Sequence, residues 1–263
     1  MTTTEKMLAR KDGRTGYVIF NNPERHNAVS MEMWDATRKI LDGYEKDGDV
    51  RVVVLTGAGG KAFVSGADIS KFGAERATPE AVAAYNKMTE MAYGGIHDFP
   101  KPTIAMIDGY CIGGGLGLAA SCDMRICSDK SRFAVPAAKL GLGYDYAGLR
   151  RLIDIVGPSF AKEIFFTARQ FDAEEARTMG LVNRVVPAVE LANYVKTYAD
   201  TIADNAPLTI GSVKLIVGEI LKDESARDLG KAAASVKRCF DSADYVEGRT
   251  AFMEKRKPVF TGR

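Results

Sequence analysis

Hydrophobic and polar positions in the first half of the chain fall into two alternating kinds of stretch. The runs TGYVIF (15–20) and RVVVLTG (51–57) are continuous and rich in β-branched residues, which indicates buried strands. Between them, Ser30 is placed to cap a helix. The apolar side of that helix is predicted by residues at helical spacing: Met33, Thr37, Ile40, Leu41 and Tyr44. A strand, a helix and a second strand in this order predict one unit of a parallel sheet.

The alternation continues through the next part of the chain. A second helix is predicted over 79–97, and Pro100 and Pro102 break the chain after it because proline cannot continue a helix. Short apolar runs then predict three further strands: TIAMID (103–108), MRIC (124–127) and RFAV (132–135). The first half therefore indicates an α/β fold with mostly parallel strands and buried sheet faces.

The second half of the chain is mainly helical. Three helical pieces and one short strand are predicted: AGLRRLIDIVG (147–157), PSFAKEIFFTA (158–168), DAEEARTMG (172–180) and VNRVV (182–186). Apolar stripes at helical spacing then run over 191–202, 213–220 and 229–240. We divide the chain into a core, residues 1–200, and a helical C-terminal region, residues 201–263, which packs on the core or on another subunit.

Composition and charge narrow the classes of partner. The 263 residues carry 36 basic and 34 acidic side chains, a net charge of +2, so neither a nucleic acid nor a membrane surface is expected as a partner. The four cysteines show no metal-ligand spacing, and no metal site is expected. We interpret them as reduced thiols of a cytoplasmic protein.

The run GYCIGGGLGLAASCD (109–123) is the most distinctive segment of the chain. Gly115, Gly117 and Ala120 match the dinucleotide-binding pattern after a strand, with Asp129 at the end of the following strand. The acidic residue in that pattern normally comes about 20 residues after the glycines, whereas Asp129 follows Gly115 by 14. A nicotinamide-dependent oxidoreductase therefore stays as a minor alternative.

A second chemical use suits these glycines better. Two glycine turns, SGAD (65–68) and GGG (113–115), each follow a β-rich run. Backbone N–H groups at the start of a helix have no partner within the helix, and glycine lets a ligand oxygen approach them closely. One N–H from each turn would hold a developing oxyanion, as acyl and enolate chemistry requires.

Four blocks of sequence resemble one family. NNPERHNAVSMEMW, KAFVSGADISKF, KPTIAMIDGYCIGGGLGLAASCD and EGRTAFMEKRKPVF resemble the crotonase (enoyl-CoA hydratase/isomerase) superfamily in order and spacing, from about residue 15 to 260. The resemblance implies a crotonase-like spiral of ββα units with a helical C-terminal trimerisation region. It also implies an acyl-CoA substrate, no cofactor beyond the coenzyme A moiety of that substrate, and a homotrimer or dimer of trimers.

The resemblance also assigns site residues. The two oxyanion donors are the backbone N–H groups of Ala67 and Gly114, while Asp68 ties down its own loop. The residues that the family motifs place along the CoA path are Arg25, His26, Ala67, Asp68, Ile69, Ser70, Gly114, Phe252 and Lys255. For the last two, the CoA is in some members that of a neighbouring subunit.

The chain departs from the family where hydratases carry two catalytic glutamates. Gly117 and Ala137 stand at those positions, so the paired carboxylates that position water are missing. Nearby, Tyr144 matches a functional tyrosine of methylmalonyl-CoA decarboxylases, and Asp145 matches a catalytic aspartate of dienoyl-CoA isomerases. Two alternatives stay open. Asp145 also suits the N-cap of the following helix. Tyr144 is also compatible with an aromatic side chain that fills the space left by the small residues Gly117 and Ala137.

These observations predict an enzyme that stabilises a thioester enolate with the Ala67 and Gly114 amides. Tyr144 or Asp145 is the predicted proton-transfer group. Isomerisation, decarboxylation or an atypical lyase step then fits better than standard hydration, which needs the two acids. The alternatives are an ordinary hydratase with acids from elsewhere, a non-catalytic CoA-thioester binder and the oxidoreductase named above.

Overall fold

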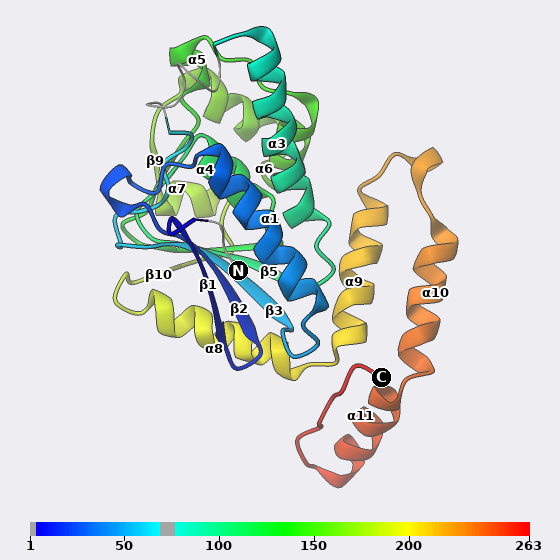
Figure 1. Cartoon of the computed structure of the whole chain (residues 1–263). Helices are drawn as coiled ribbons and strands as arrows, with labels where there is room; N and C mark the ends of the chain where they lie inside the picture. Colours follow the sequence, from blue (N-terminus) through cyan, green and yellow to red (C-terminus); the bar gives the residue numbers. More distant parts are fainter. Residues whose placement is uncertain (1–3, 69–76) are drawn as a thin grey trace.

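A six-stranded sheet forms the centre of the main body in this computed structural model, which describes residues 4–68 and 77–263 (Figure 1). The strands lie in the order β1 (Met7–Asp12), β2 (Thr15–Phe20), β3 (Val52–Gly57), β5 (Thr103–Ile107), β7 (Met124–Ser128) and β10 (Arg184–Val186). β1 runs antiparallel to β2, and the other neighbouring pairs are parallel. The predicted α/β fold with mostly parallel strands is confirmed.

Strands β2, β3, β5 and β7 of this sheet are buried on both faces, as the continuous apolar runs predict. In β3, Val53 and Leu55 belong to the larger apolar cluster, which includes the buried side of α1 (Met31–Lys46). Val52 and Val54 point the other way and pack with α8 (Leu191–Asp204). Side chains alternate in this way because successive residues of a strand face opposite sides. The parallel strands need no polar face, which explains their β-branched composition.

A second, four-stranded sheet carries the two glycine turns. Its strands are β4 (Ala62–Val64), β6 (Tyr110–Ile112), β8 (Arg132–Ala134) and β9 (Phe171–Asp172). β4 and β6 are neighbours and run parallel, so their carboxyl ends lie at the same edge of the sheet. SGAD follows β4, and GGG follows β6 and opens α4 (Gly114–Ala120). The fold therefore brings the two turns together.

Helices cover the edge where these turns meet. α3 (Pro79–His97) has the bounds predicted from the sequence and lies against α1 (Figure 1). α5 (Ala137–Leu140) and α6 (Tyr146–Thr167) follow β8. The two helical pieces predicted within α6 are joined at Gly157, whose φ of 72° interrupts the helix before Pro158. Glycine reaches this left-handed conformation without the strain that a side chain would add.

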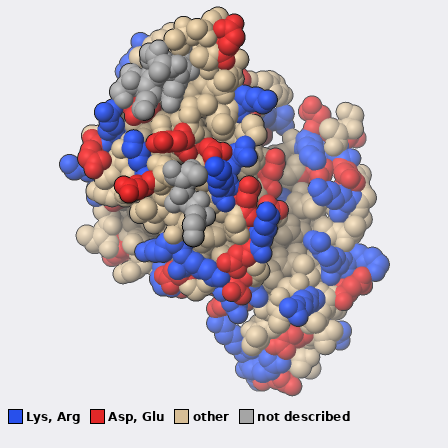
Figure 2. Space-filling view, in the orientation of Figure 1, with Lys and Arg blue, Asp and Glu red and all other residues tan. Residues whose placement is uncertain are grey.

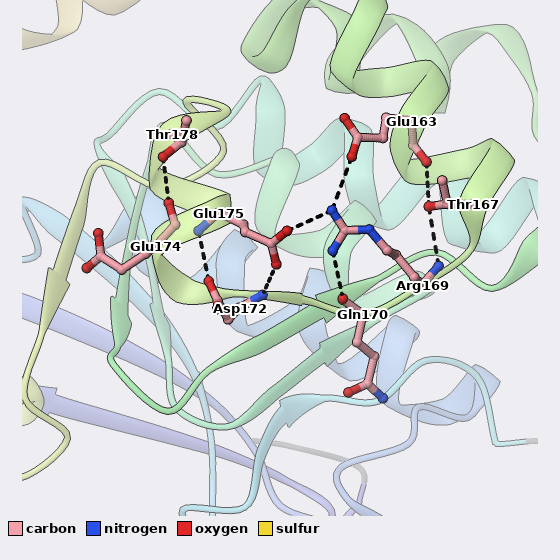
Figure 3. A network of polar contacts seen from close by, with 8 residues as sticks. All are labelled: Glu163, Thr167, Arg169, Gln170, Asp172, Glu174, Glu175 and Thr178. Atoms are coloured by element: carbon pink, nitrogen blue, oxygen red, sulfur yellow. Dashed lines mark hydrogen bonds and ion pairs between the residues drawn. The ribbon is translucent and has the colours of Figure 1, made fainter.

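A network of polar side chains fixes the connection from α6 to α7 (Ala173–Thr178), as Figure 3 shows. The guanidinium of Arg169 lies between the carboxylates of Glu163 and Glu175, at 3.1 and 2.7 Å. Glu175 also accepts a hydrogen bond from the N–H of Asp172, whose side chain caps α7 in return. Arg169 lowers the pKa of Glu175, so the carboxylate stays charged and the capping box is maintained.

The C-terminal helices extend away from the main body (Figure 1). They are α9 (Pro207–Ile220), the short η3 (Glu224–Ala226), α10 (Leu229–Phe240) and α11 (Ala243–Glu254). Large apolar side chains are exposed on them: Val213, Val217, Ile220, Leu229, Val236, Phe240, Val246, Phe252 and Met253. In contrast, α8 packs on the six-stranded sheet and so is part of the main body. It ends at Asp204, whereas the division made from the sequence was placed at residue 200.

Two local features differ from the sequence-based expectation. β1 is not predicted, because its MLARKD sequence is mostly exposed and has no apolar alternation. Ser30 occupies the N-cap of α1 as predicted, but its side chain makes no capping hydrogen bond. Its buried hydroxyl has no hydrogen-bond partner within the described part of the chain. Only the backbone carbonyl of Ser30 serves the helix start, by accepting from Met33 and Trp34.

The distribution of surface charge and the burial of the cysteines complete the description of the fold. On the face shown in Figure 2, basic and acidic side chains are interspersed over the main body and the C-terminal helices. No helix among residues 4–68 and 77–263 is both long and apolar enough to cross a bilayer. Cys111, Cys122 and Cys127 are buried free thiols, and Cys239 is half-buried.

Candidate active site

The first candidate donor is the backbone N–H of Ala67. The carbonyl of the preceding Gly66 accepts a hydrogen bond from the N–H of Val29 at 2.9 Å, and Asp68 donates back to Val29 at 3.0 Å. Because the C=O and N–H of one trans peptide point in opposite directions, the N–H of Ala67 points away from Val29. Within the described residues it donates no hydrogen bond, so it is available to a ligand.

The second candidate donor is the backbone N–H of Gly114. The carbonyl of Gly113 accepts from Leu116 and Gly117 and therefore points into α4. The N–H of Gly114 belongs to the same peptide group and points out of the helix start. It too makes no hydrogen bond to a described residue.

The three glycines of the GGG turn lie in different surroundings, and two of them are required by the backbone. Gly113 adopts φ 55° and ψ −115°, a conformation that a side chain would strain. A Cβ on Gly115 would lie 2.0 Å from the carbonyl oxygen of Val64, so only glycine lets α4 pack on β4. A Cβ on Gly114 would lie 3.7 Å from the Cα of Gly66. The two turns are thus in contact, as an oxyanion hole built from Ala67 and Gly114 requires.

The structure accounts for the side chain missing at position 117. A Cβ on Gly117 would lie 3.3 Å from both Cζ and Oη of Tyr93, a residue of α3. The Tyr93 phenol therefore occupies the space in front of this glycine. The second substituted position, Ala137, is buried at the start of α5. Neither position supplies a carboxylate.

Tyr93 is a site residue that the sequence analysis did not identify. Its hydroxyl donates a hydrogen bond to the carbonyl of Gly114 at 2.8 Å. Its ring packs edge-on against Trp34, with centroids 5.2 Å apart, and lies 5.9 Å from the guanidinium carbon of Arg151. Burial raises the pKa of Tyr93 well above 10, and Tyr85 and Tyr144 add to the rise, so the phenol is neutral near pH 7.

The predicted proton-transfer residues lie at the start of α6. Asp145 is exposed and caps this helix, since its Oδ1 accepts from the N–H of Gly148 at 2.8 Å. The capping alternative for Asp145 is thus confirmed. Tyr144 packs edge-on against Phe165 at 4.8 Å and is 39% exposed. The aromatic that fills the space at Gly117 is therefore Tyr93 and not Tyr144.

Two of the residues predicted for the CoA path contact the SGAD turn. Arg25, at the end of η1 (Pro23–Arg25), pairs with the buried carboxylate of Asp68 at 3.2 Å. This pair fixes the segment that carries Ala67, as the family resemblance implies for Asp68. His26 has φ 51°, and its carbonyl accepts from Ser65 at 3.1 Å, so its backbone also braces this turn.

The remaining predicted CoA residues are placed differently. Ile69 and Ser70 lie outside the described residues. Phe252 and Lys255 lie at the end of α11, and Figure 1 shows this helix far from α4 and the glycine turns. Phe252 is 82% exposed. Within one chain, the structure does not bring these two residues to the oxyanion hole.

Comparison with known proteins identifies the family. The enoyl-CoA hydratase/isomerase family model matches residues 11–263. A short-chain-enoyl-CoA hydratase of Clostridium acetobutylicum is 35% identical over 251 residues, which are 95% of each chain. A carnitinyl-CoA dehydratase of Proteus mirabilis is 35% identical over 253 residues, 94% of each chain.

A solved structure agrees with these sequence matches. It is described as an enoyl-CoA hydratase/carnithine racemase from Magnetospirillum magneticum and is 35% identical to this chain. The two superpose with a TM-score of 0.93 over 99% of this chain and 97% of the other. The crotonase fold predicted from the sequence is confirmed, and the chain is an acyl-CoA enzyme that belongs to the enoyl-CoA hydratase/isomerase family.

Proposed function

We propose that this enzyme stabilises the enolate of an acyl-CoA thioester with the backbone N–H groups of Ala67 and Gly114. We further propose that it carries out isomerisation, decarboxylation or an atypical lyase step rather than standard hydration. The observation that supports this most directly is the contact between Gly117 and Tyr93. A neutral phenol fills the space where a hydratase glutamate would reach the substrate.

The distinction follows from what hydration requires. One group must take a proton from water while another gives a proton to the α-carbon, and two carboxylates of different pKa serve this purpose well. Gly117 and Ala137 provide neither. A phenol whose pKa lies well above 10 is almost never ionised near pH 7, so Tyr93 is a poor base for activating water. It can still donate a proton or a hydrogen bond.

Tyr144 and Asp145 are the two proton-transfer groups predicted from the sequence. Asp145 is already used as a helix cap, whereas Tyr144 lies close enough to Tyr93 to raise the pKa of that phenol. We therefore propose that Tyr144, rather than Asp145, is the member of this pair that acts at the site, and that it acts through its effect on the Tyr93 phenol. An enzyme in which Tyr144→Phe and Asp145→Asn are combined should lose activity, and Asp145→Asn alone should keep both the activity and the α6 cap, because asparagine caps a helix as well as aspartate.

The oligomeric state is part of the proposal. Isolated C-terminal helices with many exposed apolar side chains are typical of an interface. We propose a homotrimer or a dimer of trimers, in which Phe252 and Lys255 contact the CoA held by a neighbouring subunit. Sedimentation equilibrium that returns the mass of one chain, 28.5 kDa, would contradict this arrangement.

Two measurements on the wild-type enzyme test the function. The first is exchange of the α-protons of butyryl-CoA in D2O, followed by NMR, because enolate formation exchanges these protons whatever the later chemistry. The second is hydration of crotonyl-CoA, followed by the absorbance of the enoyl thioester. We expect tight binding and measurable exchange without fast hydration. Absence of binding and exchange would contradict the oxyanion hole.

An ordinary hydratase is the second candidate, because relatives at 35% identity are named as a hydratase and a dehydratase. In that case carboxylates from other positions would have to reach the substrate. Fast hydration of crotonyl-CoA would establish this candidate and would overturn the inference drawn from Gly117 and Ala137. Substrate binding without exchange or turnover of any thioester would instead indicate a CoA-thioester binder.

A further inference from the structure

We propose that the hydroxyl of Tyr93 is the proton-transfer group for the α-carbon of the bound thioester. Tyr93 belongs to α3, and its hydroxyl would occupy the position that a side chain at residue 117 would otherwise fill. This inference rests on the enolate chemistry proposed above and names the residue that moves the proton. The assignment comes from geometry, since nothing in the sequence pattern of 79–97 singles out this tyrosine.

The phenol is hydrogen-bonded to the residue that carries one of the two proposed oxyanion donors. Its oxygen is 2.8 Å from the carbonyl oxygen of Gly114 and would be 3.1 Å from a Cβ on that glycine. It would be 3.3 Å from a Cβ on Gly117. We place the α-carbon of a thioester whose oxygen is bound to the N–H of Gly114 on the side of this hydroxyl, where the enolate would be protonated.

The ring is held in place from several sides. Trp34 of α1 packs edge-on against it at 5.2 Å. The Arg151 guanidinium of α6 lies 5.9 Å from its centroid and is itself held by Glu90, at 2.9 and 2.6 Å. The titratable and charged groups that act on the phenol are Tyr85 and Glu90 from its own helix, Tyr144 before α6, and Arg151 from α6. A fixed ring is what accurate proton transfer requires.

The proposed step balances with the groups present. The electron pair of the enolate carbon forms a new C–H bond with the hydroxyl hydrogen of Tyr93. The electron pair of the O–H bond stays on the oxygen, which becomes a phenolate, and the cationic Arg151 stabilises that charge. A proton from solvent then restores the phenol. In the reverse direction the phenol first loses its proton to solvent, and the phenolate then removes the α-proton, so exchange by this route should become faster as pH rises.

The test compares two conservative variants of tyrosines whose hydroxyls bond to backbone carbonyls. Tyr93→Phe removes the proposed proton carrier. Tyr44→Phe is the matched control, because the Tyr44 hydroxyl also bonds to backbone, to Arg10 at 2.9 Å and to Tyr17 at 3.0 Å, but belongs to the end of α1. The exchange rate of butyryl-CoA α-protons in D2O and the Kd of butyryl-CoA are measured for wild type and both variants.

We expect Tyr93→Phe to slow exchange by about 100-fold or more, the usual contribution of a general acid or base, with Kd changed less than about twofold. Tyr44→Phe should exchange at the wild-type rate. Equal exchange by wild type and Tyr93→Phe would overturn the role of Tyr93 and leave the proposed enolate chemistry standing. Loss of binding together with exchange in Tyr93→Phe would show that the hydroxyl only braces Gly114, which also overturns the proposal.

Two further results complete the test. A wild-type enzyme that binds butyryl-CoA but exchanges no α-proton would contradict the enolate chemistry itself. If Tyr93→Phe does not fold, 3-fluorotyrosine at position 93 keeps the shape of the side chain and makes the phenol more acidic. The pH profile of exchange should then move to lower pH, and an unchanged profile would overturn the proposal.

Discussion

Two hydrogen bonds join the guanidinium of Arg151 to the carboxylate of Glu90, with N–O distances of 2.9 and 2.6 Å. The pair connects α6 to α3, and it does so beside the ring of Tyr93. The Arg151 side chain is only 12% exposed, whereas Glu90 is 38% exposed. This two-point contact therefore helps set where α3, and with it the Tyr93 phenol, lies relative to the oxyanion hole.

Replacement of Arg151 by leucine should lower both stability and activity. The change leaves the Glu90 carboxylate without its partner, and because that group still reaches solvent we expect a loss of about 1–2 kcal/mol. Urea unfolding gives this value, and the exchange assay gives the effect on Tyr93. Arg177→Leu is the control, because Arg177 forms an exposed ion pair with Glu174 at (i, i+3), worth about 0.2–0.5 kcal/mol. Equal losses in the two variants would contradict a special role for Arg151.

A methyl group added at Gly115 should disrupt the site. Its Cβ would lie 2.0 Å from the carbonyl oxygen of Val64, and this backbone cannot move without displacing β4 from α4. Overpacking of this kind costs about 1–3 kcal/mol or more, so Gly115→Ala should unfold at clearly lower urea concentration. The control is Gly43→Ala in α1, where nothing lies within 4 Å of the added Cβ. That change should stabilise the protein by about 0.5–1 kcal/mol, since alanine favours helix.

The buried cysteines should be unreactive in the folded enzyme. Burial raises the pKa of Cys122 and Cys127 to about 12 and that of Cys111 well above the usual range of a thiol. At pH 8 a thiol of pKa 12 is ionised in roughly one molecule in 10,000, and the thiolate is the reactive form. Ellman's reagent should therefore label at most Cys239 in the native protein and all four thiols in urea. Rapid labelling of two or more native thiols would contradict this, and Cys239→Ser should remove the native signal.

Segment 79–97 illustrates what the sequence can and cannot predict. Its helical period and the prolines after it give the bounds of α3 correctly, because both signals are local. The contact between Tyr93 and Gly117 depends on how α3 packs over α4, and no local sequence pattern predicts that packing. A buried tyrosine on this helix is equally compatible with the core. The two glycine turns that carry the proposed oxyanion donors were predictable, because glycine turns after strands leave a strong local signal.

Asp145 illustrates a different limit. An aspartate before a helix suits both capping and chemistry, and only the structure shows its oxygen 2.8 Å from the N–H of Gly148. Phe252 and Lys255 are a third case, since their distance from the glycine turns depends on the path of the C-terminal helices. That path is determined by apolar surfaces whose partners the sequence of one chain does not identify.

The raised pKa of Tyr93 should make its contribution to stability depend on pH. In the unfolded chain a tyrosine ionises near pH 10, whereas burial raises the native pKa of Tyr93 well above that value. Above pH 10 the unfolded state therefore binds fewer protons than the native state, so stability falls as pH rises. The contribution of the Tyr93 hydroxyl is fully present below about pH 10 and is lost as pH rises towards the native pKa.

Tyr93→Phe isolates this effect, because the other tyrosines contribute equally to wild type and variant. Near pH 7 the variant should be less stable by about 1 kcal/mol, through loss of the hydrogen bond to Gly114. Above pH 10 the difference should shrink by up to about 1.4 kcal/mol per pH unit and can change sign. Urea unfolding of both proteins between pH 7 and pH 10.5 measures it. A difference that stays constant over this range would mean that the phenol ionises as readily in the folded enzyme as in the unfolded chain, and Tyr93 would then not be the buried, neutral proton donor that the site requires.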